Sequence, residues 1–88
     1  MTTLISTFSL CNRRAKPHVV AVEPWGEDFT LLPGERLEIL AMSESVQPSF
    51  EVVEWTDSSQ VYCNDAADFK VMQGGIQLEC GHQRRQAS

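Results

Sequence analysis

The sequence lacks the features that mark several large classes of protein. Its three cysteines, in 88 residues, include no C-x-x-C pair and are an odd number, which argues against a disulfide framework and fits a reducing compartment. No apolar run approaches the ~18 residues of a membrane span. No basic residue precedes the apolar start of the chain, as a secretory signal would require. These absences predict a cytoplasmic protein that does not enter a membrane.

Positive charge is scarce and unevenly placed. The chain has seven basic and twelve acidic residues, a formal net charge of −5 at pH 7. Five of the bases lie near the ends: Arg13, Arg14, Lys16, Arg84 and Arg85. All twelve acids fall between Glu23 and Glu79, and such an acidic body repels nucleic-acid phosphates. We therefore expect no nucleic-acid partner. The basic ends either contact an anionic partner or lie back on the acidic body.

Hydrophobic residues at 42% and charged residues at 22% are typical of a globular chain and exclude a disordered one. The length leaves room for one domain, residues 1–88. Within it we expect an N-terminal strand or arm over 1–16 that carries the basic cluster, a β body over 17–82, and a frayed tail over 83–88.

Short period-two alternation, interrupted by turn residues, runs through most of the chain. Such alternation with turns every 8 to 12 residues is the pattern of small all-β domains. The sequence therefore predicts a small antiparallel barrel or sandwich of seven to eight short strands. The expected strands lie at about 4–11, 18–23, 28–32, 37–41, 50–55, 61–63, 69–72 and 76–80.

Two turns are specific enough to predict their type. Leu32-Pro33-Gly34-Glu35 suits a type II turn, because proline presets φ near −65° and glycine accepts a positive φ. Gln73-Gly74-Gly75 predicts a tight hairpin with a primed turn. Residues 35–45 also carry leucine and alanine at helical spacing, but they follow the Pro-Gly turn and alternate cleanly, which favours a strand.

The segment Val22–Ile39 contains Glu-Pro-Trp-Gly-Glu followed by Pro-Gly-Glu. It resembles a segment of short, uncharacterised bacterial all-β proteins, and the resemblance extends over about two thirds of the chain. It implies the fold and no activity. A looser similarity, carried by Leu32–Glu35, is to cupins. Metal-binding cupins place two histidines one residue apart on a strand, whereas this chain has only His18 and His82. The resemblance therefore implies a cupin-like fold without the usual metal site.

Two tryptophans at expected strand ends are the main candidates for binding. Trp25 and Trp55 either cap the core or project as anchors, and tryptophan is enriched among interface hot spots. Glu27 and Asp28 follow Trp25 and add acidic character. The sequence therefore predicts a non-catalytic interaction module in which Trp25, Glu27, Asp28 and Trp55 contact a basic protein surface.

Some apolar residues are out of phase with the alternating apolar residues that we expect to face the core: Leu40, Met42, Val53, Trp55 and Met72. They predict a second apolar surface. Because large exposed apolar patches are rare in monomers, either the sandwich or a second subunit covers it. A C2 homodimer is a common solution for small β chains.

The alternative function is a cupin-like small-molecule binder with a pocket between its sheets. A metal in such a protein would be held by Cys80 and His82, with His18 or Cys63 added, but zinc needs three or four converging ligands. A hydrolase using paired acids such as Glu51 and Glu54 ranks third, because so short a chain has little room for a cleft. We therefore expect no catalytic residue and no cofactor.

Overall fold

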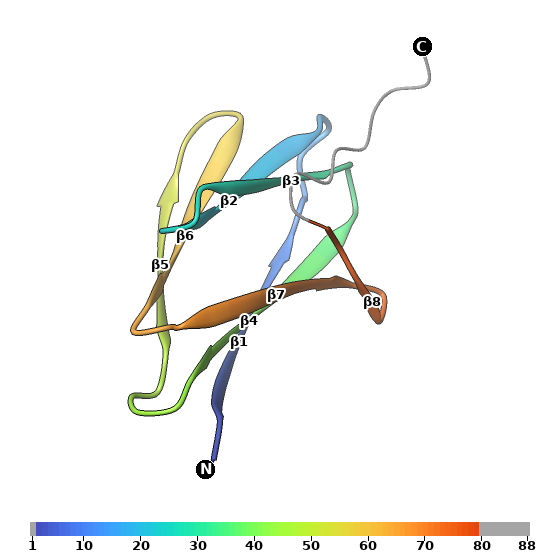
Figure 1. Ribbon diagram of the computed structural model, residues 1–88. Coiled ribbons are helices and arrows are strands. Elements are labelled where there is room, and N and C mark those ends of the chain that lie inside the picture. The colour runs from blue at the N-terminus through green and yellow to red at the C-terminus, as the bar shows by residue number, and fades with distance from the viewer. Residues whose placement is uncertain (1, 80–88) are drawn as a thin grey trace.

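The computed structural model describes residues 2–79, which form eight strands in two sheets (Figure 1). The strands are β1 (Leu4–Cys11), β2 (His18–Glu23), β3 (Glu27–Leu31), β4 (Arg36–Ser43), β5 (Ser49–Glu54), β6 (Ser58–Asn64), β7 (Asp68–Gln73) and β8 (Ile76–Gln77). Sheet A has the order β1-β4-β7-β8, and sheet B has the order β3-β2-β6-β5. The predicted all-β class is confirmed. The two sheets are not joined into a closed barrel within the described residues, so these residues form a sandwich.

Sheet pairing is antiparallel with one exception. β2 and β6 run parallel at the centre of sheet B, with Val19 opposite Ser58 and Val22 opposite Val61. The sequence predicted only antiparallel pairing. The difference arises because β2 and β6 are not joined by a hairpin: β3, β4 and β5 intervene, and β4 lies in the other sheet. None of the described residues belongs to a helix able to cross a membrane.

The first segment is an edge strand and not a detached arm. β1 pairs with β4 along its whole length, from Leu4 opposite Ser43 to Cys11 opposite Arg36. Its alternate side chains Phe8 and Leu10 face inward and pack against the core. The basic residues 13–16 therefore follow a strand that is part of the sandwich, while the expected tail over 83–88 lies outside the described residues.

Both predicted turns form. The Glu35 amide donates to the Leu32 carbonyl at 3.0 Å, and Gly34 has φ +84°, as position three of a type II turn requires. Gly74 and Gly75 have φ +58° and +82°, so both central residues of the β7–β8 hairpin take the positive φ of a type I′ turn.

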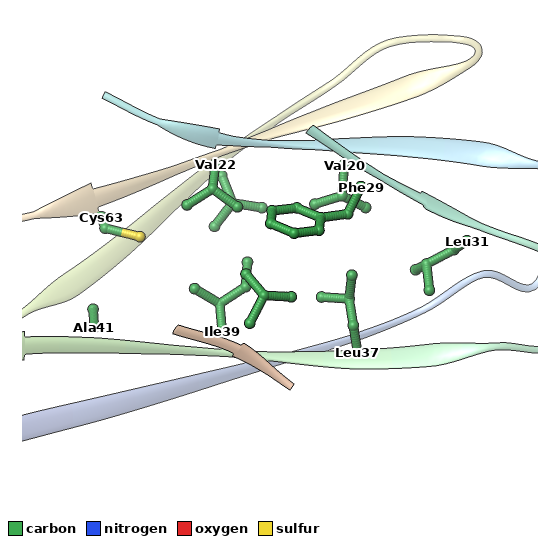
Figure 2. Packing of buried hydrophobic residues seen from close by; sticks show 10 residues of the cluster. Val20, Val22, Phe29, Leu31, Leu37, Ile39, Ala41 and Cys63 are labelled. Carbon is green, nitrogen blue, oxygen red and sulfur yellow. The ribbon is translucent and has the colours of Figure 1, made fainter. Parts of the chain in front are cut away.

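The core lies between the sheets and draws on both (Figure 2). Ten buried residues form it: Val20, Val22, Phe29, Leu31, Leu37, Ile39, Ala41, Val61, Cys63 and Val71. Figure 2 shows Val20, Val22 and Phe29 pointing from sheet B towards Leu37 and Ile39 of sheet A. The inner faces are therefore filled, and the alternate side chains of every strand are directed outwards. The outer faces are the surfaces on which a site can be built.

Candidate functional site

An open groove of about 450 Å³ lies on the outer face of sheet B. It is lined by Val19, Ala21, Gly26, Asp28, Trp55, Ser58 and Gln60. The small residues of β2 form its floor because Val19 and Ala21 alternate with the buried core residues Val20 and Val22. The strand pattern that builds the core thus also builds the groove.

Strand register explains why the sheet is hollowed at this point. One row across sheet B runs Asp28, Ala21, Gln60 and Val53, in the strand order β3-β2-β6-β5. A single methyl group at Ala21 lies between the longer side chains of Asp28 and Gln60. Because paired residues share a face of the sheet, the longer side chains border a depression over the alanine.

Trp55 stands at one end of this groove, immediately after β5. Its side chain is 58% exposed. Two contacts fix it: its amide donates to the Ser58 carbonyl at 2.8 Å, and its indole Nε1 donates to Gln60 Oε1 at 2.9 Å. Gln60 Nε2 in turn donates to Glu23 Oε2 at 3.2 Å. The indole is therefore held in place while much of its surface faces solvent.

The outer face of sheet B is acidic. Glu23 and Glu51 lie in one row with Tyr62 between them, and Asp28 lies in the next row. The basic side chains of the described residues come from other segments: three in the loop at 13–16, of which Arg14 pairs with Glu54 of β5 at 3.4 Å, and Arg36 and Lys70 on β4 and β7 of sheet A. This face therefore presents carboxylates and an exposed indole with no lysine or arginine among its described residues.

The structure separates the four predicted binding residues into two pairs. Trp55 and Asp28 line the same groove. Trp25 instead packs on Phe69 of β7, with ring centroids 4.4 Å apart, and contacts the core, so it is a core cap. Glu27 pairs with the buried Val22, on the opposite side of β3 from Asp28. Sequence analysis missed Gln60 and the other outward residues of β6, because only the parallel β2–β6 register brings them to the groove.

The predicted second apolar surface does not exist as one patch. Leu40, Met42 and Met72 lie half-buried on the outer face of sheet A, where charged side chains of β4 and β7 intervene. Val53 and Trp55 belong to sheet B, on the other side of the molecule. Alternation assigns residues to a face of their own strand, but it does not say which sheet that strand joins.

The buried His18 and Ser59 form a polar cluster with the exposed Glu54 beside the groove end, and Arg14 pairs with Glu54 at 3.4 Å. The Ser59 hydroxyl donates to Glu54 Oε1 at 2.6 Å and lies 2.8 Å from His18 Nε2. Because the serine proton is given to the carboxylate, His18 Nε2–H donates to the serine oxygen. Ser59 is fully buried and the acid contacts the serine rather than the histidine. In a catalytic triad the histidine lies between the acid and the serine, whereas here the serine lies between the other two. The buried hydroxyl cannot be reached by a substrate.

The cluster makes stability depend on pH. Burial, and then the charge of Arg14, lower the pKa of His18 below its ordinary 6.5, against the opposing effects of Glu54 and Asp57. Its buried Nδ1 has no hydrogen-bond partner among the described residues, so protonation would add an unpaired donor. Below pH 6.5 the unfolded chain therefore binds more protons than the folded one, and acid lowers the free energy of unfolding.

We expect the free energy of unfolding to fall between pH 7 and pH 5.5 by up to about 1.4 kcal/mol per pH unit, and His18→Gln to remove that slope. Urea titrations at several pH values measure it. Both proteins are compared in a His82→Gln background, so that His18 is the sole histidine of the reference. Parallel slopes with and without His18 would contradict the prediction.

The described residues hold no group of three or more side chains suited to a metal ion. Burial raises the pKa of Cys63 to about 11, so its thiol stays protonated at neutral pH and is a poor ligand and nucleophile. Cys11 is half-buried at the end of β1. The predicted pair Cys80 and His82 lies outside the described residues.

Comparison with protein-family models, curated proteins and solved structures found no match for this chain.

Proposed function

We propose that this chain is a non-catalytic binding module that takes an arginine- or lysine-rich segment of a partner protein on the outer face of sheet B. The supporting observation is the exposed Trp55, held by Gln60 at the end of a groove bordered by Asp28. The face carries carboxylates and, among its described residues, no base. It thus offers complementary charge and an aromatic surface in one place.

The exposed indole and the carboxylates of this face can each bind a basic side chain. A guanidinium stacks on an indole face with about 0.5–2 kcal/mol of favourable energy, depending on its desolvation. The Asp28 and Glu23 carboxylates lie on the same face and accept charge-assisted hydrogen bonds from the next basic side chain. An indole that is already fixed loses little conformational entropy on binding. The groove is open, which suits an extended peptide better than a small molecule.

The cupin-like alternative has no comparable support in the described residues. It requires a ligand pocket between the sheets, and that space is occupied by core side chains whose exposure is 4% or less (Figure 2). The residues named for its metal, Cys80 and His82, lie outside the described residues. We therefore propose the groove, and not the interior, as the binding site.

We expect a fluorescein-labelled arginine-rich peptide to bind, and Trp55→Ala to weaken its binding about tenfold. The reason is the loss of the stacking surface, which is worth about 1–2 kcal/mol at a partly desolvated site. Fluorescence anisotropy at low salt measures the dissociation constant. Binding should weaken as salt is added, because the contributing charges are exposed.

Ile76→Ala is the control, since Ile76 is an apolar residue at least as exposed as Trp55, at 69% against 58%, on β8 of sheet A. It should leave the dissociation constant unchanged, whereas Asp28→Lys should weaken binding with the fold intact. Equal affinity of the Trp55→Ala and Ile76→Ala proteins, or an absence of salt-sensitive binding by the wild type, would refute the proposed function.

A further inference from the structure

The edges of the two sheets differ in how well they are protected. Exposed edge strands invite pairing with another chain, and charged side chains are a common protection. β3 and β5 each carry two acids, and β8 is only two residues long. β1 is eight residues long, with the sequence Leu-Ile-Ser-Thr-Phe-Ser-Leu-Cys, and has no charge and no proline. It is the one long uncharged edge among the described strands.

Backbone geometry shows which groups of β1 point away from β4. The Asn12 amide and carbonyl, just past the strand, bond to Glu35 and Gly34 on the β4 side. The Ile5 carbonyl points the opposite way and accepts from Gln47 Nε2 at 2.9 Å. Because both backbone groups of a strand residue point to one side and alternate along the strand, Thr7, Ser9 and Cys11 also point outwards.

The free part of the edge is short and well defined. The loop between β4 and β5 covers its first residues, because Gln47 bonds to Ile5 and the Ser6 hydroxyl donates to the Pro48 carbonyl at 2.6 Å. Within the described residues nothing pairs with the outward backbone groups of Thr7, Ser9 and Cys11. Residues 7–11 therefore offer a five-residue template for one more strand.

We infer that this edge pairs antiparallel with the same edge of a second copy, about a two-fold axis at Ser9. Ser9 then faces Ser9 of the second copy, Thr7 faces Cys11, and Phe8 faces Leu10. Three hydrogen-bonded pairs give about six backbone hydrogen bonds. The two A sheets become one continuous eight-stranded sheet, with the inward Phe8 and Leu10 side chains in contact across the junction.

Charge complementarity favours a second copy as the occupant. In this register the residues after β1 come level with the start of β1 in the other copy, so Arg13 approaches the loop that carries Glu44. Both side chains are exposed, and neither has an ion pair among the described residues. The two-fold axis repeats the contact, so each copy gives one base and one acid. The same surface serves both copies, as a closed C2 dimer requires.

A charge-swap experiment tests the axis at Ser9. Ser9→Lys places two like charges face to face, and we expect it to raise the dimer dissociation constant roughly a hundredfold. Ser9→Glu should do the same. Mixing the two variants should restore a dimer that contains one copy of each. With the Ser9→Glu protein uniformly labelled with nitrogen-15, native mass spectrometry across a wide range of protein concentration distinguishes all three species by mass.

Ser49→Lys is the control, because Ser49 is an exposed serine on β5, one of the two edge strands of the other sheet. This protein should remain dimeric. Far-ultraviolet circular dichroism checks that each variant is folded. We expect all of them to fold, because the Ser9 side chain is exposed and its replacement leaves the core unchanged. A wild type that is monomeric at every concentration, a dimer indifferent to Ser9→Lys, or mixed variants that do not associate would each overturn the inference.

Discussion

Phe29→Ala is expected to lower the free energy of unfolding by about 3–5 kcal/mol. Phe29 is 1% exposed and lies between the sheets (Figure 2), where alanine would leave a cavity lined by side chains of both layers. It is also one of only two buried hydrophobic side chains contributed by β3, a five-residue edge strand. Small domains are stable by about 5–15 kcal/mol, so the loss removes a large part of the total.

Urea unfolding followed by circular dichroism measures this loss. Ile76→Ala is the control, because a truncation at an exposed position away from the core should change stability by less than about 0.5 kcal/mol. Phe29→Leu should fall between the two, since it retains most of the buried volume. A loss below about 1 kcal/mol for Phe29→Ala would mean that the two sheets are not closely packed at this point.

Asn12→Asp is expected to cost about 3 kcal/mol or more, although it barely changes the shape of the side chain. Asn12 is 1% exposed, and its Nδ2 donates to the carbonyls of Lys16 and Leu31, each at 2.9 Å. Its Oδ1 accepts from the Arg14 amide at 3.0 Å. A carboxylate keeps the last bond but faces two carbonyl oxygens with no donor, and it is a buried charge.

The same urea titration measures this effect, with Asn64→Asp as its control. The Asn64 amide donates to Glu51 at a solvent-exposed site, so water can replace the lost bond and screens the new carboxylate from Glu51, and the change should be below about 1 kcal/mol. Equal stability of the two variants would show that Asn12 does not anchor the loop between β1 and β2. Because the two substitutions are chemically identical, the expected contrast comes from the burial and the hydrogen-bond partners of the two sites.

Alternation and turn chemistry allowed every strand to be located from the sequence. Both turns, at Leu32–Glu35 and Gly74-Gly75, follow from the backbone preferences of the residues concerned. These are local properties, set by neighbours within a few positions. Which sheet each strand joins is not local, since a strand with one apolar face packs equally well in either layer.

The candidate site depends on which strands are neighbours in each sheet, and short sequence patterns do not specify this. Trp25 and Trp55 both follow a strand, yet one caps the core and the other lies exposed beside Gln60. Asp28 and Glu27 are adjacent, and the alternation of side chains along β3 puts them on opposite faces. The groove arises from the pairing of β2 with β6, which no short sequence window encodes.

The parallel β2–β6 pair also has a consequence for how the chain folds. Neither half of the sequence can complete a sheet, because Val19 needs Ser58 in sheet B and β4 needs both β1 and β7 in sheet A. Folding therefore waits for contacts between distant parts of the chain, whose closure entropy slows the search. During synthesis the complete native sheets can form only after most of the chain has left the ribosome, so a β1–β4 pair formed early leaves the β7 side of β4 uncovered and open to premature association.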